Sequence, residues 1–341
     1  ELDNHDDFGG HAKRNEFHQG GRMMLSLGGA QNVENPAGYS KPASSLMHAI
    51  GIDDDFVASM DANTPADQFL AGDLDAPNGV SLPGPYGHTT LAGNWLAMMY
   101  GGEGYEDYVR KLPIPSSEQD KFIDFFGGKR DFLDDLSLSE TWEYINTVSY
   151  NRFLLDRVKL DETSLPVMNA MLVHLTGMSG WNLSVLEGIT QGGPGIKSLG
   201  WLARTSASIA GAFLDSLLNV KMFPDGNASV ARLIVQKLVP AVAPDMQGPE
   251  DVAVARFNYA ALDRANPPTR IRLNSTVVRA RETDGKHVEV DYVQKGQALR
   301  VTADHCVMAC YNALIPHLCP QMPKAQKEGL SYGVKTPFVY A

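Results

Sequence analysis

The sequence contains few cysteines, no long apolar run and no block of basic residues. Its three thiols, Cys306, Cys310 and Cys319, are too few for a disulfide framework, and their spacing lacks the paired CxxC pattern of a zinc site. No apolar run reaches the ~18 residues that span a bilayer. Lys and Arg number 29 against 40 Asp and Glu, and the net charge of −11 disfavours nucleic acid and anionic membranes as partners. We therefore expect no membrane span, no nucleic-acid partner, and cysteines that are core residues or free thiols.

The composition is that of a globular protein, with 43% hydrophobic and 20% charged residues. A length of 341 residues is enough for two domains with a sizeable core. The acidic balance attracts cationic small molecules, although many proteins are acidic for solubility alone. Because the chain starts at Glu1 without a Met or a basic leader, targeting cannot be read from it, and we expect further sequence on both sides to complete the fold.

Glycine pairs and helical periodicity divide the first two thirds of the chain. Residues 1–45 are rich in glycine pairs and predict loops. Residues 46–223 are mainly helical, because apolar residues recur at intervals of three and four, for instance in 163–175 and 198–218. Within that stretch, 73–90 and 112–117 hold enough Gly and Pro to predict loops.

The last third changes from helical to alternating patterns. The turn Phe223-Pro224-Asp225-Gly226-Asn227 precedes a helix that Pro240 closes. Apolar and polar residues then alternate in 270–281, 287–294 and 298–303, with a turn at Lys295-Gly296, which predicts an antiparallel meander. The apolar run 306–310 predicts a strand buried on both faces, and 330–340 predicts another extended segment.

The stretch Leu2-Asp3-Asn4-His5-Asp6-Asp7-Phe8-Gly9-Gly10 suits a dinucleotide-binding site. In such sites an acidic residue at a strand end accepts hydrogen bonds from ribose hydroxyls, about 20 residues after a GxGxxG turn, which would here lie before Glu1. Gly9 and Gly10 let the backbone pass close to a pyrophosphate, with His11, Lys13 or Arg14 nearby to offset its charge. The alternative is that Asp3 is only a strand-end turn residue.

Several strings resemble, in the same order along the chain, those of the FAD-dependent amine oxidoreductases, and most closely the bacterial spermidine dehydrogenases. The strings are "LDNHDDFGGHAKRNEF", Gly28-Gly29-Ala30-Gln31, "FPDGNAS", Leu273-xxx-Val277-xx-Ala280, "ACYNALIPHLCP" and "YGVKTP". The sequence departs from the family pattern at three positions. Asp3 replaces a Glu, His11 replaces an Arg, and Asn227 replaces a Gly.

The resemblance implies roles for individual residues. Val277 would meet the adenine through its backbone, and Lys335 would hold a water at flavin N5 as the catalytic residue. The turn at 28–31 would lie under the isoalloxazine ring, and the strand at 307–312 would return beside the cofactor. The implied cofactor-binding residues are Asp3, Asn4, Gly9, Gly10, His11, Arg14, Gly28, Gly29, Ala30, Gln31, Val277, Ala309 and Cys310.

The implied fold class is α/β, with a discontinuous, Rossmann-like, three-layer FAD/NAD(P)-binding domain and an inserted, mainly helical substrate domain. The expected boundaries are 1–45 and 224–322 for the FAD-binding domain and 46–223 for the substrate domain. Residues 323–341 would begin the sheet of the substrate domain.

The implied reaction is oxidation of a spermidine-like polyamine by hydride transfer to flavin N5, giving an imine that hydrolyses to an aldehyde and an amine. The resemblance also implies haem, which would be non-covalent because the sequence has no CxxCH motif, an external electron acceptor of unknown identity, and a bacterial periplasmic location. Trp181, Trp201 and Tyr311 either wall the amine pocket through cation–π contacts or pack in a core. Two alternatives remain open: another amine or amino-acid oxidase or desaturase on this fold, and a non-catalytic fragment that cannot retain flavin.

Two further patterns have competing interpretations. His5, His11 and His18 recur at intervals of six and seven, but no helical repeat brings them together, so we expect surface histidines and no metal site. The segment 192–197 is similar to a phosphate loop, yet it lacks the GK[ST] ending and predicts a connection between helices.

Overall fold

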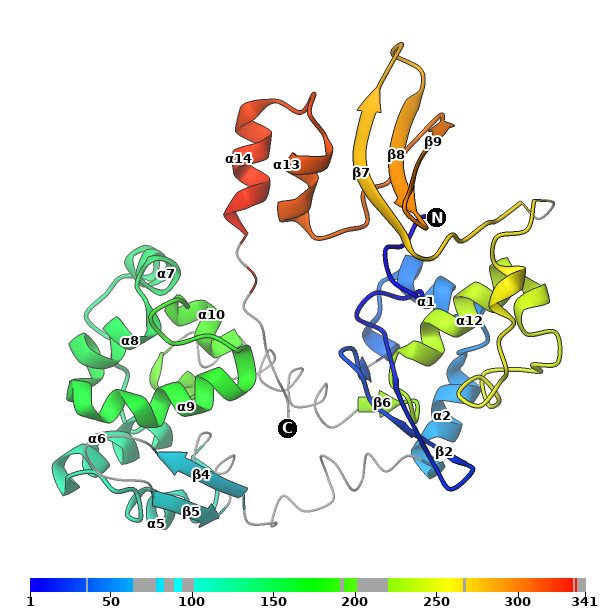
Figure 1. The fold of residues 1–341 in the computed structure, drawn as a ribbon. Helices are drawn as coiled ribbons and strands as arrows, with labels where there is room; N and C mark the ends of the chain where they lie inside the picture. Colours follow the sequence, from blue (N-terminus) through cyan, green and yellow to red (C-terminus); the bar gives the residue numbers. More distant parts are fainter. Residues whose placement is uncertain are drawn as a thin grey trace. The chain divides into compact units, whose positions relative to one another are not determined.

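The computed structural model describes residues 1–34, 36–63, 78–82, 89–93, 101–190, 193–200, 220–265, 268–333 and 335 (Figure 1). The chain divides into two compact units. Unit 1 contains Glu1–Thr64 and Val220–Lys335, and unit 2 contains Pro65–Asn219 and Thr336–Ala341. Unit 1 is therefore built from two distant stretches of the chain.

Unit 1 combines small sheets with short helices. The hairpin of β1 (Asn15–Gln19) and β2 (Arg22–Ser26) turns at Gly20-Gly21, and β3 (Asn32–Glu34) pairs antiparallel with β6 (Val220–Met222). The helices of the unit are α1 (Lys41–Ala49), α2 (Asp54–Asn63), α12 (Ala228–Leu238), α13 (Ile315–Leu318) and α14 (Lys324–Tyr332), with short 3₁₀ turns at Pro36–Gly38, Pro240–Val242, Tyr259–Ala261 and Asn312–Leu314.

The predicted meander is confirmed as β7 (Ser275–Glu282), β8 (Val288–Gln294) and β9 (Gln297–Ala303), paired antiparallel in that order. Lys295 and Gly296 both have positive φ, at 50° and 75°, as a two-residue hairpin turn of type I′ requires. Ala280 and Val290 are buried side by side on one face of the sheet. On an exposed part of the sheet, Asp291 pairs with Arg279 and Arg300 from the neighbouring strands.

The predicted helix after Asn227 is confirmed as α12, and it lies between two apolar clusters of unit 1. Leu233 packs in a cluster with residues of α1 and α2, and Val235 packs in a second cluster with Phe8. Because the buried side chains of 46–63 belong to the first of these clusters, this stretch is part of unit 1. The compact units divide after Thr64, whereas the expected domain boundary lay at residue 45.

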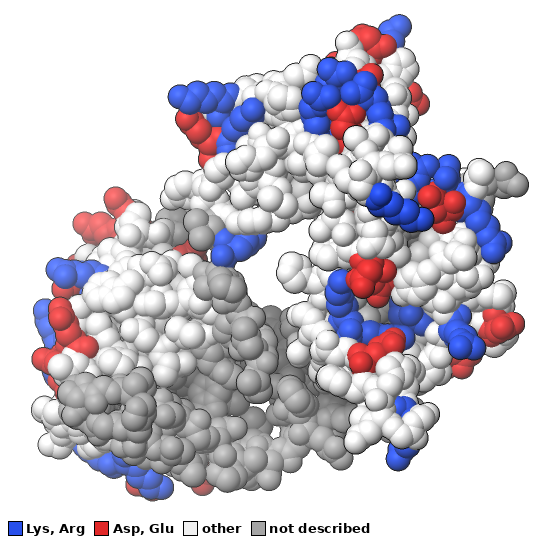
Figure 2. All heavy atoms as spheres, in the orientation of Figure 1, with Lys and Arg blue, Asp and Glu red and all other residues white. Residues whose placement is uncertain are grey.

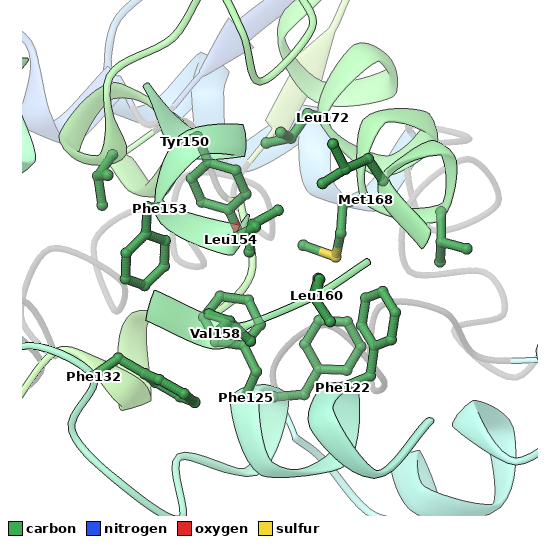
Figure 3. Packing of buried hydrophobic residues seen from close by; sticks show 14 of the residues in the cluster. Phe122, Phe125, Phe132, Tyr150, Phe153, Leu154, Val158, Leu160, Met168 and Leu172 are labelled. Carbon is green, nitrogen blue, oxygen red and sulfur yellow. The ribbon is translucent and has the colours of Figure 1, made fainter. Parts of the chain in front are cut away.

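Unit 2 is helical around an aromatic core. Its described helical elements are α5 (Tyr105–Val109), α6 (Ser116–Gly127), α7 (Leu138–Thr147), α8 (Tyr150–Phe153), a π-helical turn (Leu154–Val158), 3₁₀ turns (Glu162–Ser164 and Ile196–Ser198), α9 (Leu165–Thr176) and α10 (Val185–Thr190). Figure 3 shows Phe122 and Phe125 of α6 facing Phe153, Met168 and Leu172 of the neighbouring helices, and all five are fully buried.

The predicted helix at 163–175 is confirmed as α9, and the loop at 112–117 as the connection from α5 to α6. The loop at 73–90 is wrong in part, because β4 (Asn78–Leu82) and β5 (Thr89–Gly93) form a hairpin there. Most of the helix expected at 198–218 lies outside the described residues.

Two extended segments expected near the end of the chain are corrected. Residues 306–310 form no strand, and Val307 is 88% exposed, because no neighbouring strand in the described residues pairs with it. The expected extended segment at 330–340 begins inside the helix α14, and its residues 334 and 336–340 lie outside the described part of the chain. That helix belongs to unit 1 and so does not begin a sheet of the substrate domain.

The fold is a mixture of helices and small antiparallel sheets, which is compatible with the expected α/β class only in its mixture of the two element types. In the described part of the chain, parallel pairing occurs at the single bridge between Leu2 and Arg272, and no multi-stranded Rossmann sheet is present. None of the described helices combines the length and the apolar character needed to cross a membrane.

Candidate functional site

Asp3 follows Leu2, which forms an isolated parallel bridge with Arg272 in the segment leading into β7. Its backbone N–H donates to the carbonyl of Arg272 at 2.9 Å, and its carbonyl accepts from the N–H of Ser275 at 2.7 Å. In its carboxylate, Oδ1 accepts from the backbone N–H of His5 and lies 2.9 Å from the Nδ1 of the same residue. Among the described residues, Oδ2 has no hydrogen-bond partner. Within the described ranges, the structure therefore holds the carboxylate of Asp3 through Oδ1 alone.

Val277, the expected adenine contact, follows Ser275 by two residues in β7. A strand advances about 3.3 Å per residue, so the backbone of Val277 lies roughly 7 Å along β7 from the residue bonded to Asp3. The pairing of β7 with β8 shifts between Val277 and Arg279, which leaves Val278 as a β-bulge. Bulges are common beside functional sites because they redirect the strand. The structure thus brings Asp3 and Val277 to the same edge.

The Gly9-Gly10 turn needs glycine. The φ angles are +97° and +57°, a region that side chains rarely enter, and the N–H of Ala12 closes the turn by donating to the carbonyl of Gly9 at 2.9 Å. A Cβ on Gly9 would stand 3.0 Å from the Cβ of Ala231 in α12. The turn is therefore pressed against the first turns of that helix, while Asn4 and Gly10 are exposed.

The segment Gly28–Gln31 is wedged between residues 11–14 and the start of α12. A Cβ on Gly28 would stand 1.7 Å from the carbonyl oxygen of Lys13, so only glycine fits. The N–H of Ala30 donates to the carbonyl of His11 at 3.0 Å, and the N–H of Asn227 donates to the carbonyl of Ala30 at 2.9 Å. The structure thus joins two neighbouring glycine-containing stretches, 9–14 and 28–31, to the distant turn that precedes α12.

Arg14 lies at this junction with its side chain largely buried. Its guanidinium donates to the carboxylates of Asp225 (3.1 Å) and Glu16, and to the carbonyl of Ala253 (2.6 Å). Burial opposes its charge, yet hydrogen bonds with the two carboxylates outweigh burial and raise the pKa of Arg14. Asp225 is completely buried and also accepts from Ser229 at 2.5 Å. Four of its five N–H donors are used within the protein, which leaves Arg14 little donor capacity for a pyrophosphate.

His11 and Lys13 are the other basic residues of this segment. His11 is exposed, and Lys13 is 38% exposed, with one long ion pair of 3.7 Å to the carboxylate of Asp6 among the residues that the structure describes. These two side chains are free to turn toward a phosphate.

Sequence reasoning missed Arg232, a buried cation of α12. Its guanidinium donates to the carbonyls of Val252 and Ala255 and lies 3.7 Å from the ring centroid of Phe257. Burial, and then repulsion from Arg14, lower its pKa. The signal was its position three residues from both Ser229 and Val235, on the buried face of the helix.

The expected residues near the end of the chain are dispersed. Ala309 and Cys310 lie in the irregular exposed segment, and in the described part of the chain no hydrogen bond joins them to residues 1–31. Tyr311 donates its hydroxyl to the carbonyl of Gly333 at 2.9 Å, two residues before Lys335, which is exposed. Trp181 is 49% exposed in unit 2, and Trp201 lies outside the described residues.

The surface of the described chain mixes charges of both signs, with Lys and Arg beside Asp and Glu (Figure 2). Two of the three spaced histidines contact carboxylates: His5 pairs with Asp3, and His18 lies 3.5 Å from Glu16. In the described ranges, no group of three His, Cys, Asp or Glu side chains is placed to hold a metal ion.

FAD fits the junction best at its adenosine end. The acceptor oxygen of Asp3, the bulged edge at Val277 and the positive-φ glycines suit a ribose, an adenine and a close backbone approach. At the start of α12, the side-chain oxygen of Asn227 is buried without a hydrogen-bond partner, an acceptor that a ligand donor would satisfy. No protein-family model and no curated protein matches the sequence. The assignment therefore depends on these contacts and on the motifs.

Proposed function

We propose that this protein binds FAD at the junction of residues 3–14, 28–31 and 277 and oxidises an amine of the polyamine class. The observation that carries the proposal is that residues 3–14 contact both Gly28–Gln31 and the start of β7 in unit 1. Asp3 supplies a ribose acceptor, Gly9-Gly10 a close backbone approach, and β7 a strand edge for the adenine.

The carboxylate of Asp3 is the most informative group of the proposed site. A ribose presents two hydroxyl donors, and a carboxylate is the acceptor that such donors prefer. Asp3 is suited to this task because His5 holds Oδ1 at 2.9 Å and so fixes the direction of Oδ2. With 16% of its side chain exposed, it combines partial burial with access to a ligand.

The glycines support the phosphate region. Backbone N–H groups bind phosphates only where no side chain blocks the approach, and Gly10 has no heavy atom within 4 Å of the position that a Cβ would take. By contrast, Gly28 and Gly29 pack tightly on the carbonyls of Lys13 and His11. The first pair thus supports contact with the ligand, and the second supports the junction itself.

Bound FAD would supply the hydride acceptor at N5, where the carbon next to an amine nitrogen is oxidised. The residues of the protein would orient the amine and exclude water from it. The amine class rests on the resemblance to spermidine dehydrogenases and is supported by the net charge of −11, which attracts cations. Lys335 is proposed as the residue nearest the chemistry.

The test is anaerobic reduction of the bound flavin. The protein from the complete gene is loaded with FAD and mixed with spermidine, with a neutral amino acid as the competing substrate class. Spermidine should bleach the flavin and yield one aldehyde and one shorter amine. Lys335→Ala should slow bleaching, and Lys324→Ala, a change at a lysine 90% exposed, should not. Bleaching by the amino acid alone would redirect the proposal to an amino-acid oxidase, and retention of no flavin would refute it.

A further inference from the structure

We propose that Tyr259 is a positioning residue for the Gly9-Gly10 turn, holding it in the form that receives the cofactor. The inference rests on the proposed function for what the turn binds. Its geometrical part stands on contacts between residues 7–9 and residues 257–259, which are separated by most of the chain.

A single carboxylate oxygen joins the two segments. The hydroxyl of Tyr259 donates to Oδ1 of Asp7 at 2.8 Å, and the backbone N–H of Phe8 donates to the same oxygen at 2.9 Å. Phe8 directly precedes Gly9. The tyrosine hydroxyl therefore acts on the backbone one residue before the turn.

Aromatic packing also holds Phe8, the residue that precedes the turn, in place. Phe8 is 4% exposed, and its ring stacks on that of Tyr259 with centroids 5.9 Å apart and an interplanar angle of 25°. Phe257 packs on Phe8 at 6.1 Å and carries the guanidinium of Arg232 over its ring. Arg232 is in turn held by the carbonyls of Val252 and Ala255. The base of the turn is thus a continuous packed unit built from α12 and the segment that follows it.

A turn of two glycines needs such a base. Glycine has the largest conformational freedom of any residue, so Gly9-Gly10 has little preference of its own for φ angles of +97° and +57°. Ala12 closes the far side of the turn through its bond to the carbonyl of Gly9. On the near side, Asp7 and Phe8 are the fixed points. Ordering the turn in advance lowers the entropic cost of ligand binding.

The tyrosine remains a donor over a wide pH range. Burial, and then the hydrogen bond to Asp7, raise the pKa of Tyr259 above its ordinary value of 10.0. The hydroxyl is therefore protonated at neutral pH and keeps its bond to Oδ1.

The experiment is Tyr259→Phe, which removes the hydroxyl and keeps the stacked ring. Hydrogen exchange of peptides spanning residues 4–14 should accelerate, while peptides from α12 keep their protection. Affinity for FAD should fall about 3- to 10-fold, as loss of one hydrogen bond to a charged group at a partly exposed site implies. Tyr105→Phe is the matched control, because that hydroxyl also donates to a carboxylate, Glu106 at 3.1 Å, but in unit 2.

Two Asp7 variants distinguish a role in positioning the Gly9-Gly10 turn from a general loss of stability. Asp7→Asn keeps an acceptor oxygen and should retain slow exchange, whereas Asp7→Ala should reproduce Tyr259→Phe. Unchanged exchange in residues 4–14 of Tyr259→Phe would overturn the inference, as would wild-type affinity for FAD. If the wild-type protein binds no FAD, the proposed function fails, and the exchange rates still decide whether Tyr259 fixes the turn.

Discussion

Replacing Gly28 with alanine should separate the stretches that form the candidate site. A Cβ at this position would stand 1.7 Å from the carbonyl oxygen of Lys13 and 2.5 Å from its carbonyl carbon. Real contacts of this kind are at least 3.0 Å, and the obstacle is backbone, which has no rotamer to change. The two segments must therefore move apart by more than an ångström.

The cost follows from what that movement breaks. The bond from Ala30 to the carbonyl of His11 (3.0 Å) lies two residues away, and the bond from Asn227 to Ala30 (2.9 Å) depends on the same segment. Loss of two hydrogen bonds at roughly 1 kcal/mol each, together with packing strain of about 1–3 kcal/mol, predicts a loss of about 3–5 kcal/mol in the free energy of unfolding. That is a large share of the stability of a typical domain.

Urea denaturation combined with hydrogen exchange measures this loss. Protection of α12 amides should fall in Gly28→Ala, whereas protection of α6 in unit 2 should stay near the wild-type value. Gly329→Ala is the control, because that glycine lies in α14 with no atom within 4 Å of a new Cβ, so the change should be neutral or stabilising by up to about 1 kcal/mol. A wild-type midpoint for Gly28→Ala would refute the close approach of residues 13 and 28.

Three further changes test charges and packing elsewhere in the chain. Asp225→Asn should cost about 3–5 kcal/mol in urea denaturation, because it leaves the guanidinium of Arg14 without its buried carboxylate, whereas Asp120→Asn, in an exposed pair, should cost less than about 1 kcal/mol. Phe125→Ala should destabilise unit 2 by about 3–5 kcal/mol, measured by the same denaturation, since the ring is completely buried. For Glu118, burial raises the pKa but hydrogen bonds to neighbouring groups outweigh it, so the pKa lies below the ordinary 4.5. Its contribution is present above about pH 4.5 and is lost as the pH falls through the lowered pKa, so Glu118→Gln should be destabilised at pH 7 and approach wild type in acid.

Local patterns predicted the local structure well. The alternation of residues in 287–294 and 298–303, with Lys295-Gly296 between them, predicted β8, β9 and their turn, because each depends on neighbouring residues. The helix after Asn227 was predicted for the same reason. In each case the information lies within about ten residues.

Features that depend on partners were not predicted. The run 306–310 has the composition of a buried strand, but a strand also needs a neighbour to bond with, and composition does not say whether one is present. Arg14 was expected at a ligand and is instead paired with Asp225, 211 residues away. Arg232 was missed because its partners are backbone carbonyls, which the sequence does not identify, and its spacing from Ser229 and Val235 was the only mark of its burial.

The most direct test of the account is the affinity of the protein for FAD and for ADP, which carries the adenosine half of FAD, with Asp3 replaced by alanine. Loss of charge-assisted bonds worth about 1.5–3 kcal/mol predicts roughly 10- to 100-fold weaker binding of both ligands. Asp6→Ala, at a carboxylate 87% exposed on the same loop, should bind both as the wild type does. Equal affinities for Asp3→Ala and wild type would contradict the account, because the ribose would then be held elsewhere.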